Sequence, residues 1–322
     1  MIYINFKSGQ GLGNQLWLYI VGLSVAKKIK TNLKILNYKN FIGKSFLELR
    51  YFRSKKKKID HIFYERLYHD KEIKYISHLF DERILDIKKN TLLEGYFQDE
   101  RYFFKKKINL KEYIFFKSIK KLSTLFLDRE TCIVNIRGGE YKRYKEFILP
   151  KKYWIDSMNL MRKRGVKKFI LVTDDEQYCK HFLPGYPIIS NSVENCFLYI
   201  YKAQNLIVSN SSFSYFPISM QDKTPFVLAP AYWARHANKK KRWASISNFY
   251  SNWHWVDSDG KLLKKADILK SINKIELMYK NNYNLLSDFN YFDHLGIRKY
   301  IPKLLRNFIK KILRFVLPLR FG

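Results

Sequence analysis

The chain opens with MIYINFKSGQGLGNQ at residues 1–15, a strand pattern that runs into a glycine-rich turn. Within 1–6, apolar side chains occupy every second position, which is typical of a buried strand. A mostly apolar stretch at 14–30 favours a helix, and a second short strand is predicted at 32–36. Strand, glycine turn, helix and strand form the opening of a βαβ unit. These residues therefore predict an α/β fold built on a parallel sheet.

The second half of the chain shows the same alternation more clearly. Short apolar runs that predict strands alternate with longer runs that predict helices. The predicted strands are 132–136, 168–173, 187–190, 205–208 and 226–229, and the predicted helices follow Pro150 and Asp175 and begin near 193 and 211. A doubly wound sheet of this kind binds ligands beyond the carboxyl ends of its strands, and this chain carries polar clusters at those ends.

The intervening region has weaker patterns. Residues 59–89 and 99–126 are expected to be mostly helical, with a short strand at 92–98 between them. We place a domain boundary near Asp128 to Thr131. The predicted domains are an N-terminal, acceptor-side domain at 1–128, a nucleotide-sugar-binding domain at 129–255 and a helical extension at 256–322.

The composition limits the class of protein. At 47% hydrophobic residues, the 322-residue chain has ample apolar surface for a core, which excludes a disordered protein. Lys and Arg number 61 against 28 Asp and Glu, a formal net charge of +33. This balance suits an anionic partner, either a nucleic acid, a phosphate-bearing small molecule or an anionic membrane. A coding bias toward Lys, Ile and Asn accounts for the same excess, so charge alone does not decide.

Cysteine usage and the N-terminus bear on location. Three scattered cysteines are too few for a disulfide framework or a zinc site, which favours a reducing compartment. The first residues lack the basic and apolar regions of a signal peptide. The longest nearby apolar run, 16–26, is interrupted and too short to span a bilayer. We therefore expect a cytoplasmic or peripheral protein.

Arg137 is the most informative polar residue. It follows the predicted strand at 132–136 and precedes Gly138 and Gly139. An arginine at the end of a strand, in backbone opened by glycines, is suited to gripping a phosphate bidentately. Glu140 would orient it. The alternative is a surface Arg–Glu pair of little energetic value.

Two further clusters follow later strands. Asp174 and Asp175 are suited to accepting hydrogen bonds from a ribose or base, or to capping the next helix. A metal is not expected there, because no further ligand except Glu176 is close in sequence. The stretch 210–214, NSSFS, is suited to an anion site at a helix start or to a plain serine cap.

Taken in order, these clusters resemble the motifs of glycosyltransferase family 11, the bacterial and animal α-1,2-fucosyltransferases. The resemblance extends over about residues 1–255. Its segments are GLGNQ at 11–15, EGYFQ at 94–98, NIRGGEY at 135–141, TDD at 173–175 and NSSFS at 210–214, with Pro230 and Trp233 in a further stretch.

The resemblance implies the GT-B architecture, in which two Rossmann-like domains face a central cleft. It also implies an inverting transfer of fucose from GDP-fucose, without a metal or other cofactor, to a glycan acceptor. Arg137 and the serine segment would contact the donor diphosphate, and an acidic residue would activate the acceptor hydroxyl. The implied donor-binding residues are Asn14, Arg137, Asp174, Asp175, Ser211, Ser212 and Phe213. The catalytic candidates are Arg137, Glu140 and Glu146, with Glu94 and Asp99 as rival bases.

The chain departs from the family pattern at three positions. Asn135 replaces a histidine, Gly138 replaces the second arginine and Glu140 replaces an aspartate. Another nucleotide sugar as donor therefore stays open, as does an inactive scaffold. A nucleic-acid-binding protein is a further alternative, although no nucleic-acid-binding motif is recognised and no such partner is expected.

The C-terminal residues 303–316 predict a basic amphipathic helix. Apolar residues fall on one half of the helical wheel and Lys and Arg on the other, and no acidic residue follows 298. This pattern is typical of a helix lying on an anionic membrane; the alternative is a helix packed on the protein. The first interpretation predicts a protein peripheral to the inner face of the cell membrane, with a lipid-linked glycan as acceptor.

Overall fold

The computed structural model describes most of the chain. The described residues are 1–53, 58–70, 75–78, 80–104, 108–117, 125–143, 147–231, 234–235, 242–243, 249–257, 259–282 and 284–286. Three features singled out above lie outside them, namely Glu146, Trp233 and the tail 303–316.

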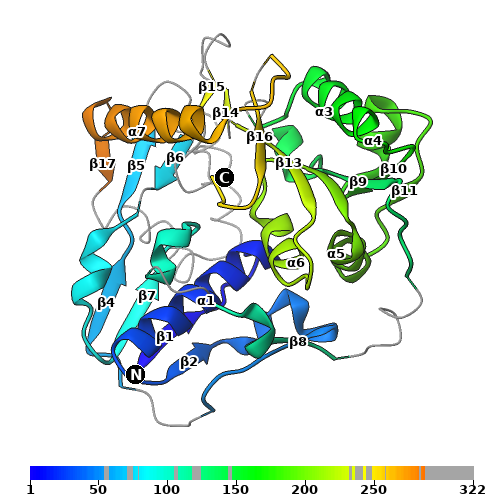
Figure 1. The fold of residues 1–322 in the computed structure, drawn as a ribbon. Coiled ribbons are helices and arrows are strands. Elements are labelled where there is room, and N and C mark those ends of the chain that lie inside the picture. The colour runs from blue at the N-terminus through cyan, green and yellow to red at the C-terminus, as the bar shows by residue number, and fades with distance from the viewer. Residues whose placement is uncertain are drawn as a thin grey trace, which may run out of the picture.

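The N-terminal half is built on a parallel sheet of four strands. The sheet order is β2 (Leu33–Leu36), β1 (Ile2–Asn5), β7 (Thr91–Glu94) and β4 (His61–Tyr64). Helix α1 (Leu12–Lys28) connects β1 to β2 and is buried on most of its surface. A helix that is apolar nearly all round belongs between layers, and α1 lies between the two halves of the molecule (Figure 1).

The second half contains a parallel sheet of six strands. Its order is β11 (Ile188–Ile189), β10 (Lys168–Thr173), β9 (Thr131–Ile136), β12 (Asn205–Val208), β13 (Phe226–Pro230) and β16 (His254–Val256). The helices of this half are α3 (Lys151–Lys163), α4 (Glu176–Phe182), α5 (Val193–Lys202) and α6 (Tyr215–Ser219). All six residues of β9 are buried, because helices and neighbouring strands cover the central strand of a doubly wound sheet. The predicted α/β class, with two Rossmann-like parallel units, is confirmed.

The expectation of mostly helical structure at 59–89 and 99–126 is wrong. The first range contains β4, β5 (Leu67–Asp70), β6 (Tyr75–His78) and the 3-10 helix η3 (Glu82–Asp86). The second contains η4 (Glu100–Phe103), η5 (Leu110–Glu112) and β8 (Ile114–Phe116), which pairs with β3 (Leu47–Leu49). Aromatic and β-branched residues such as those of HIFY at β4 favour strands once a neighbouring strand is available. That neighbour, β7, is distant in sequence.

The chain returns to its N-terminal half at the C-terminal end of the described part. Helix α7 (Lys265–Asn282) crosses toward that half (Figure 1), and β17 (Asn284–Leu286) pairs antiparallel with β5. The expected extension therefore contributes a strand as well as a helix. The remaining short elements are η1 (Tyr38–Asn40), η2 (Ile42–Ser45), η6 (Glu140–Arg143), η7 (Ser212–Ser214), β14 (Ala234–Arg235) and β15 (Arg242–Trp243).

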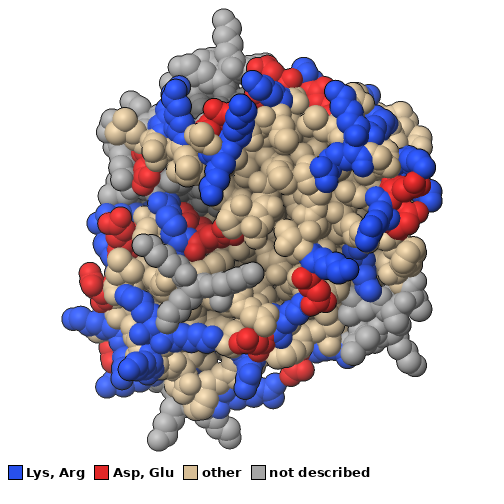
Figure 2. All heavy atoms as spheres, viewed as in Figure 1, with Lys and Arg blue, Asp and Glu red and all other residues tan. Residues whose placement is uncertain are grey.

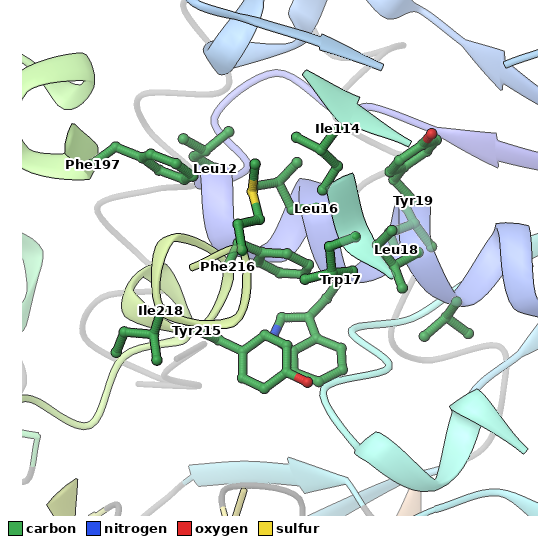
Figure 3. Close-up of a cluster of buried hydrophobic side chains, with 14 of the residues drawn as sticks. Leu12, Leu16, Trp17, Leu18, Tyr19, Ile114, Phe197, Tyr215, Phe216 and Ile218 are labelled. Carbon is green, nitrogen blue, oxygen red and sulfur yellow. The ribbon is translucent and has the colours of Figure 1, made fainter. Parts of the chain in front are cut away.

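A continuous apolar core joins the two halves. Trp17 of α1 is fully buried, and its ring centroid lies 4.4 Å from that of Tyr215 and 5.6 Å from that of Phe216, both on α6 (Figure 3). A second cluster, including Tyr153 and Trp154, lies between α3 and the larger sheet. These contacts fix α1 against α6, and with it the loops that carry the polar clusters. In the described part of the chain, no helix has the length and apolar character needed to cross a membrane.

Candidate functional site

Arg137 lies at the carboxyl end of β9 and is held there by an ion pair. Its Nη1 lies 2.9 Å from Oδ2 of Asp174, at the end of the adjacent strand β10. The other oxygen of Asp174 accepts a hydrogen bond of 2.9 Å from the backbone N–H of Gly138. A Cβ atom on Gly139 would lie 2.4 Å from Asp174 Oδ2, so any larger residue there would displace the carboxylate. The Arg-Gly-Gly sequence thus wraps around one carboxylate that orients the arginine.

The same guanidinium retains unused hydrogen-bonding capacity. Its Nε is buried and has no hydrogen-bond partner among the described residues. Its Cζ lies 5.4 Å from the ring centroid of Tyr141, whose hydroxyl donates to the carbonyl of Asn210 at 2.9 Å. Burial raises the pKa of Tyr141 to about 12 although Arg137 opposes the shift, so this hydroxyl stays protonated and donating. A fixed guanidinium with a free donor is a suitable anion ligand.

Asp175 has a structural function. It caps α4 by accepting a 2.9 Å hydrogen bond from the N–H of Tyr178, and its other oxygen forms an ion pair with Lys142. Burial would raise the pKa of Asp175, but Lys142 and the cap together hold it below its usual value. Both predicted carboxylates are therefore engaged within the chain, and their contact with a nucleotide stays a prediction.

Asn14 joins three sequence motifs at one point. Its Oδ1 accepts a 2.6 Å hydrogen bond from Nε2 of Gln98 and a 2.9 Å hydrogen bond from Oγ of Ser212. The start of α1 approaches η7 so closely that a Cβ on Gly13 would lie 2.7 Å from Ser212 and 2.8 Å from the nitrogen of Phe213. The glycine turn, the EGYFQ segment and the serine segment therefore meet at Asn14.

The serine segment is packed by hydrogen bonds to its surroundings. Ser211 accepts from the N–H of Phe213 at 3.3 Å, which caps η7. Ser214 donates to Oδ1 of Asn135 at 2.7 Å, and the amide of Asn135 donates to the carbonyl of Val172 at 3.1 Å. Asn135, which stands in place of the family's histidine, is thus a buried link between β9, β10 and η7.

The candidate bases differ in their surroundings. Glu94 pairs with Lys7 at 2.5 Å, and Asp99 pairs with Arg101 at 2.7 Å while capping η4. Glu140 is exposed at the start of η6, three residues after Arg137. Glu146 lies outside the described residues. Glu140 is the candidate nearest to Arg137 in sequence, and which acid acts as base stays a prediction.

Sequence reasoning missed several residues of this region. Gln98 and Tyr141 lie within motifs that were quoted, so their motif membership was the available signal. Lys142, which neutralises Asp175, follows the motif directly. The described residues contain no group of three or more His, Cys, Asp or Glu side chains arranged to hold a metal ion. The three cysteines are buried and unpaired.

Charge on the visible face is dispersed. Figure 2 shows Lys and Arg side chains spread around this face, interspersed with Asp and Glu, with uncharged residues over much of the centre. On this face the excess positive charge is not gathered into one stripe of the kind that nucleic-acid-binding surfaces present.

A comparison with protein families matches residues 18–257 to the model of glycosyl transferase family 11. The chain belongs to this family. It is therefore a glycosyltransferase by descent, and the arginine, serine and glycine segments described above lie in or beside the matched region. A search of curated proteins found no match.

Solved structures share parts of the architecture at low identity. NodZ α-1,6-fucosyltransferase soaked with GDP-fucose is 12% identical, with a TM-score of 0.38, over 68% of this chain and 92% of that chain. POFUT1 in complex with GDP is 11% identical, with a TM-score of 0.41, over 71% and 96%. The E. coli heptosyltransferase WaaC with ADP is 10% identical, with a TM-score of 0.42, over 86% and 99%.

Proposed function

We propose that this glycosyltransferase is an α-1,2-fucosyltransferase that transfers L-fucose from GDP-fucose to a galactose-type hydroxyl of a surface glycan. The glycan would be a lipopolysaccharide, a capsule or an O-antigen. The observation that carries the proposal is Arg137, oriented by Asp174 at the carboxyl end of β9 with a buried, unused Nε. The family's motif order supports fucose as the sugar.

The chemistry follows from charge development on the donor. As the bond between sugar and diphosphate breaks, negative charge grows on the β-phosphate. Arg137 would stabilise that charge without having to reorganise, because Asp174 already fixes it. Hydroxyl and N–H groups of 211–213 would add hydrogen bonds to the diphosphate, for which the Ser212 hydroxyl and the Phe213 N–H would leave their present acceptors on Asn14 and Ser211. Asn14 would position the sugar or diphosphate. These donors would replace a metal ion, so we expect neither a metal nor a cofactor.

Inversion requires a base on the face of the sugar opposite the leaving diphosphate. A carboxylate would take the proton of the acceptor hydroxyl as that oxygen attacks the anomeric carbon. Glu140 and Glu146 are the proposed candidates, because both follow Arg137 on one stretch of chain.

We also propose that the enzyme works at the cytoplasmic face of the cell membrane. The basic amphipathic pattern at 303–316 supports this location, and a lipid-linked glycan would then be within reach. Removing residues 298–322 is expected to abolish co-sedimentation with anionic liposomes; unchanged co-sedimentation would contradict this location.

The function is tested with a panel of nucleotide sugars and a β-galactoside acceptor. Of the panel, we expect only GDP and GDP-fucose to raise the melting temperature of the protein, since a ligand stabilises the folded state by mass action. Product analysis should then show fucose on the 2-hydroxyl of galactose. A shift with another nucleotide sugar would replace fucose as the donor sugar, and binding without turnover of any acceptor would favour a scaffold, for which the loss of an arginine at Gly138 is the specific observation.

A further inference from the structure

Glu65 is a buried carboxylate that no sequence motif marks. It follows β4 directly and is only 2% exposed. Burial raises the pKa of Glu65 to about 8, against hydrogen bonds that lower it. Burying an acid is unfavourable unless its oxygens accept hydrogen bonds. The hydrogen-bond partners of Glu65 therefore indicate its role.

Those partners belong to the EGYFQ segment and to η4. Oε2 accepts hydrogen bonds from the backbone N–H of Tyr96 at 2.7 Å and of Phe97 at 2.9 Å. Oε1 accepts from the hydroxyl of Tyr102 at 2.8 Å. Two consecutive N–H groups on one oxygen fix the conformation of the turn that contains them.

The turn has the shape this contact demands. A Cβ on Gly95 would lie 2.5 Å from Cβ of Glu65. Phe97 adopts a left-handed conformation with φ of 53°, which is unfavourable for a side chain of its size and persists only where surrounding contacts impose it. The carboxylate of Glu65 supplies those contacts.

Gln98, the next residue, connects this turn to the candidate site. Gln98 donates at 2.6 Å to Oδ1 of Asn14, which also accepts from Ser212. With Oδ1 engaged twice, rotation of the Asn14 amide is blocked. The orientation of Asn14 therefore depends on Gln98, and the position of Gln98 depends on the turn that Glu65 holds.

We propose that Glu65 is a positioning residue for the transfer reaction, because it fixes the 95–98 turn and, through Gln98, orients Asn14 beside Ser212. The functional consequence rests on the proposed role of Asn14 at the donor. The structural coupling between Glu65 and Asn14 does not, and it is tested separately.

The test compares Glu65→Ala and Gln98→Ala with a control variant, Asp81→Asn. Asp81 is also a buried carboxylate beside this region, and its side chain accepts from the backbone N–H of Arg66 and from Arg83. Its backbone N–H donates to the hydroxyl of Tyr102, and asparagine at this position keeps that contact. Amide hydrogen exchange is followed in peptides covering 94–98 and 11–16 in the full-length protein, together with kcat and KM for GDP-fucose.

Glu65→Ala should accelerate exchange in both peptides, and Gln98→Ala in 11–16 alone. Asp81→Asn should lower the melting temperature without changing exchange at 11–16. In Glu65→Ala and Gln98→Ala, Asn14 should lose one oriented hydrogen bond to the negatively charged GDP-fucose. That loss corresponds to a fall of about tenfold or more in kcat/KM for GDP-fucose. Glu65→Gln, which keeps an acceptor for the two N–H groups, should recover most of it.

Unchanged exchange at 11–16 in Gln98→Ala would overturn the coupling, even if Glu65→Ala failed to fold. Faster exchange at 11–16 with unaltered kcat/KM for GDP-fucose would overturn the role of Glu65 in transfer. If the wild type neither binds nor uses GDP-fucose, the proposed donor is wrong, and the exchange measurements still decide whether Glu65 positions Asn14.

Discussion

Adding one methyl group at Gly13 should separate the two halves where the motifs meet. In Gly13→Ala the new Cβ would lie 2.7 Å from the carbonyl carbon of Ser212 and 2.8 Å from the backbone nitrogen of Phe213. Backbone atoms cannot rotate away as a side chain does, so either α1 or η7 must move. That movement would break the hydrogen bond between Asn14 and Ser212.

The magnitude follows from three contributions. Overpacking of this kind costs about 1–3 kcal/mol, and loss of the hydrogen bond adds about 0.5–1.5 kcal/mol. The better helix propensity of alanine offsets about 0.5–1 kcal/mol. We therefore expect the free energy of unfolding to fall by roughly 0.5–4 kcal/mol in total.

The assay is urea unfolding followed by tryptophan fluorescence, with Gly11→Ala as the matched control. Gly11 lies two residues earlier in the same turn, has φ of −63°, and an added Cβ would meet nothing within 4 Å. The free energy of unfolding of Gly11→Ala should fall by less than about 1 kcal/mol, because only the preference for the helix N-cap position changes. Equal losses in the two variants would refute the close approach of α1 to η7.

Three further predictions concern the hydrogen-bonded carboxylates and the buried amide. Asp174→Asn removes the ion pair that orients Arg137 but leaves an acceptor for Gly138; the Kd for GDP in titration calorimetry should rise about tenfold, and an unchanged Kd would contradict the orienting role. Asn135→Ala removes buried hydrogen bonds to Ser214 and Val172, and urea unfolding should show a loss of about 2–4 kcal/mol; a loss under about 1 kcal/mol would show that the link is dispensable. The pKa of Glu65 is raised from 4.5 to about 8 in the folded state, so its contribution to stability is fully present below about pH 4.5 and is lost as the pH rises through about 8; Glu65→Gln should flatten this decline in unfolding free energy, and an identical slope in both proteins would contradict the assignment.

The parts of the fold that sequence alone predicted are those with local signals. The strand at 168–173 was predicted with the bounds of β10, because an apolar run ends in two aspartates, one of which caps the next helix. The strand at 205–208 matches β12 for the same kind of reason. By contrast, β4 and β8 depend on partners far away in the chain, namely β7 and β3, and β5 pairs with the distant β17 as well as with the nearby β6. Local periodicity carries no information about such partners.

The candidate site shows the same division. Motif membership singled out Asn14, Arg137 and Ser212, which lie at the carboxyl ends of strands or at the start of a helix. It did not reveal that Asp174 serves Arg137, since that pairing depends on β9 and β10 being neighbours. Glu65 could not be predicted from the sequence, because its role depends on hydrogen bonds to the 95–98 turn that form only in the folded chain.

The central claim is that Arg137 binds the diphosphate of a guanine nucleotide sugar. The most direct test is titration calorimetry of GDP against wild type, Arg137→Ala and Arg129→Ala. Arg129 is exposed and precedes the opposite end of β9, so it controls for the loss of one positive charge. We predict measurable binding by wild type and Arg129→Ala, and a Kd at least about tenfold weaker in Arg137→Ala. Equal affinity in all three proteins would contradict the account.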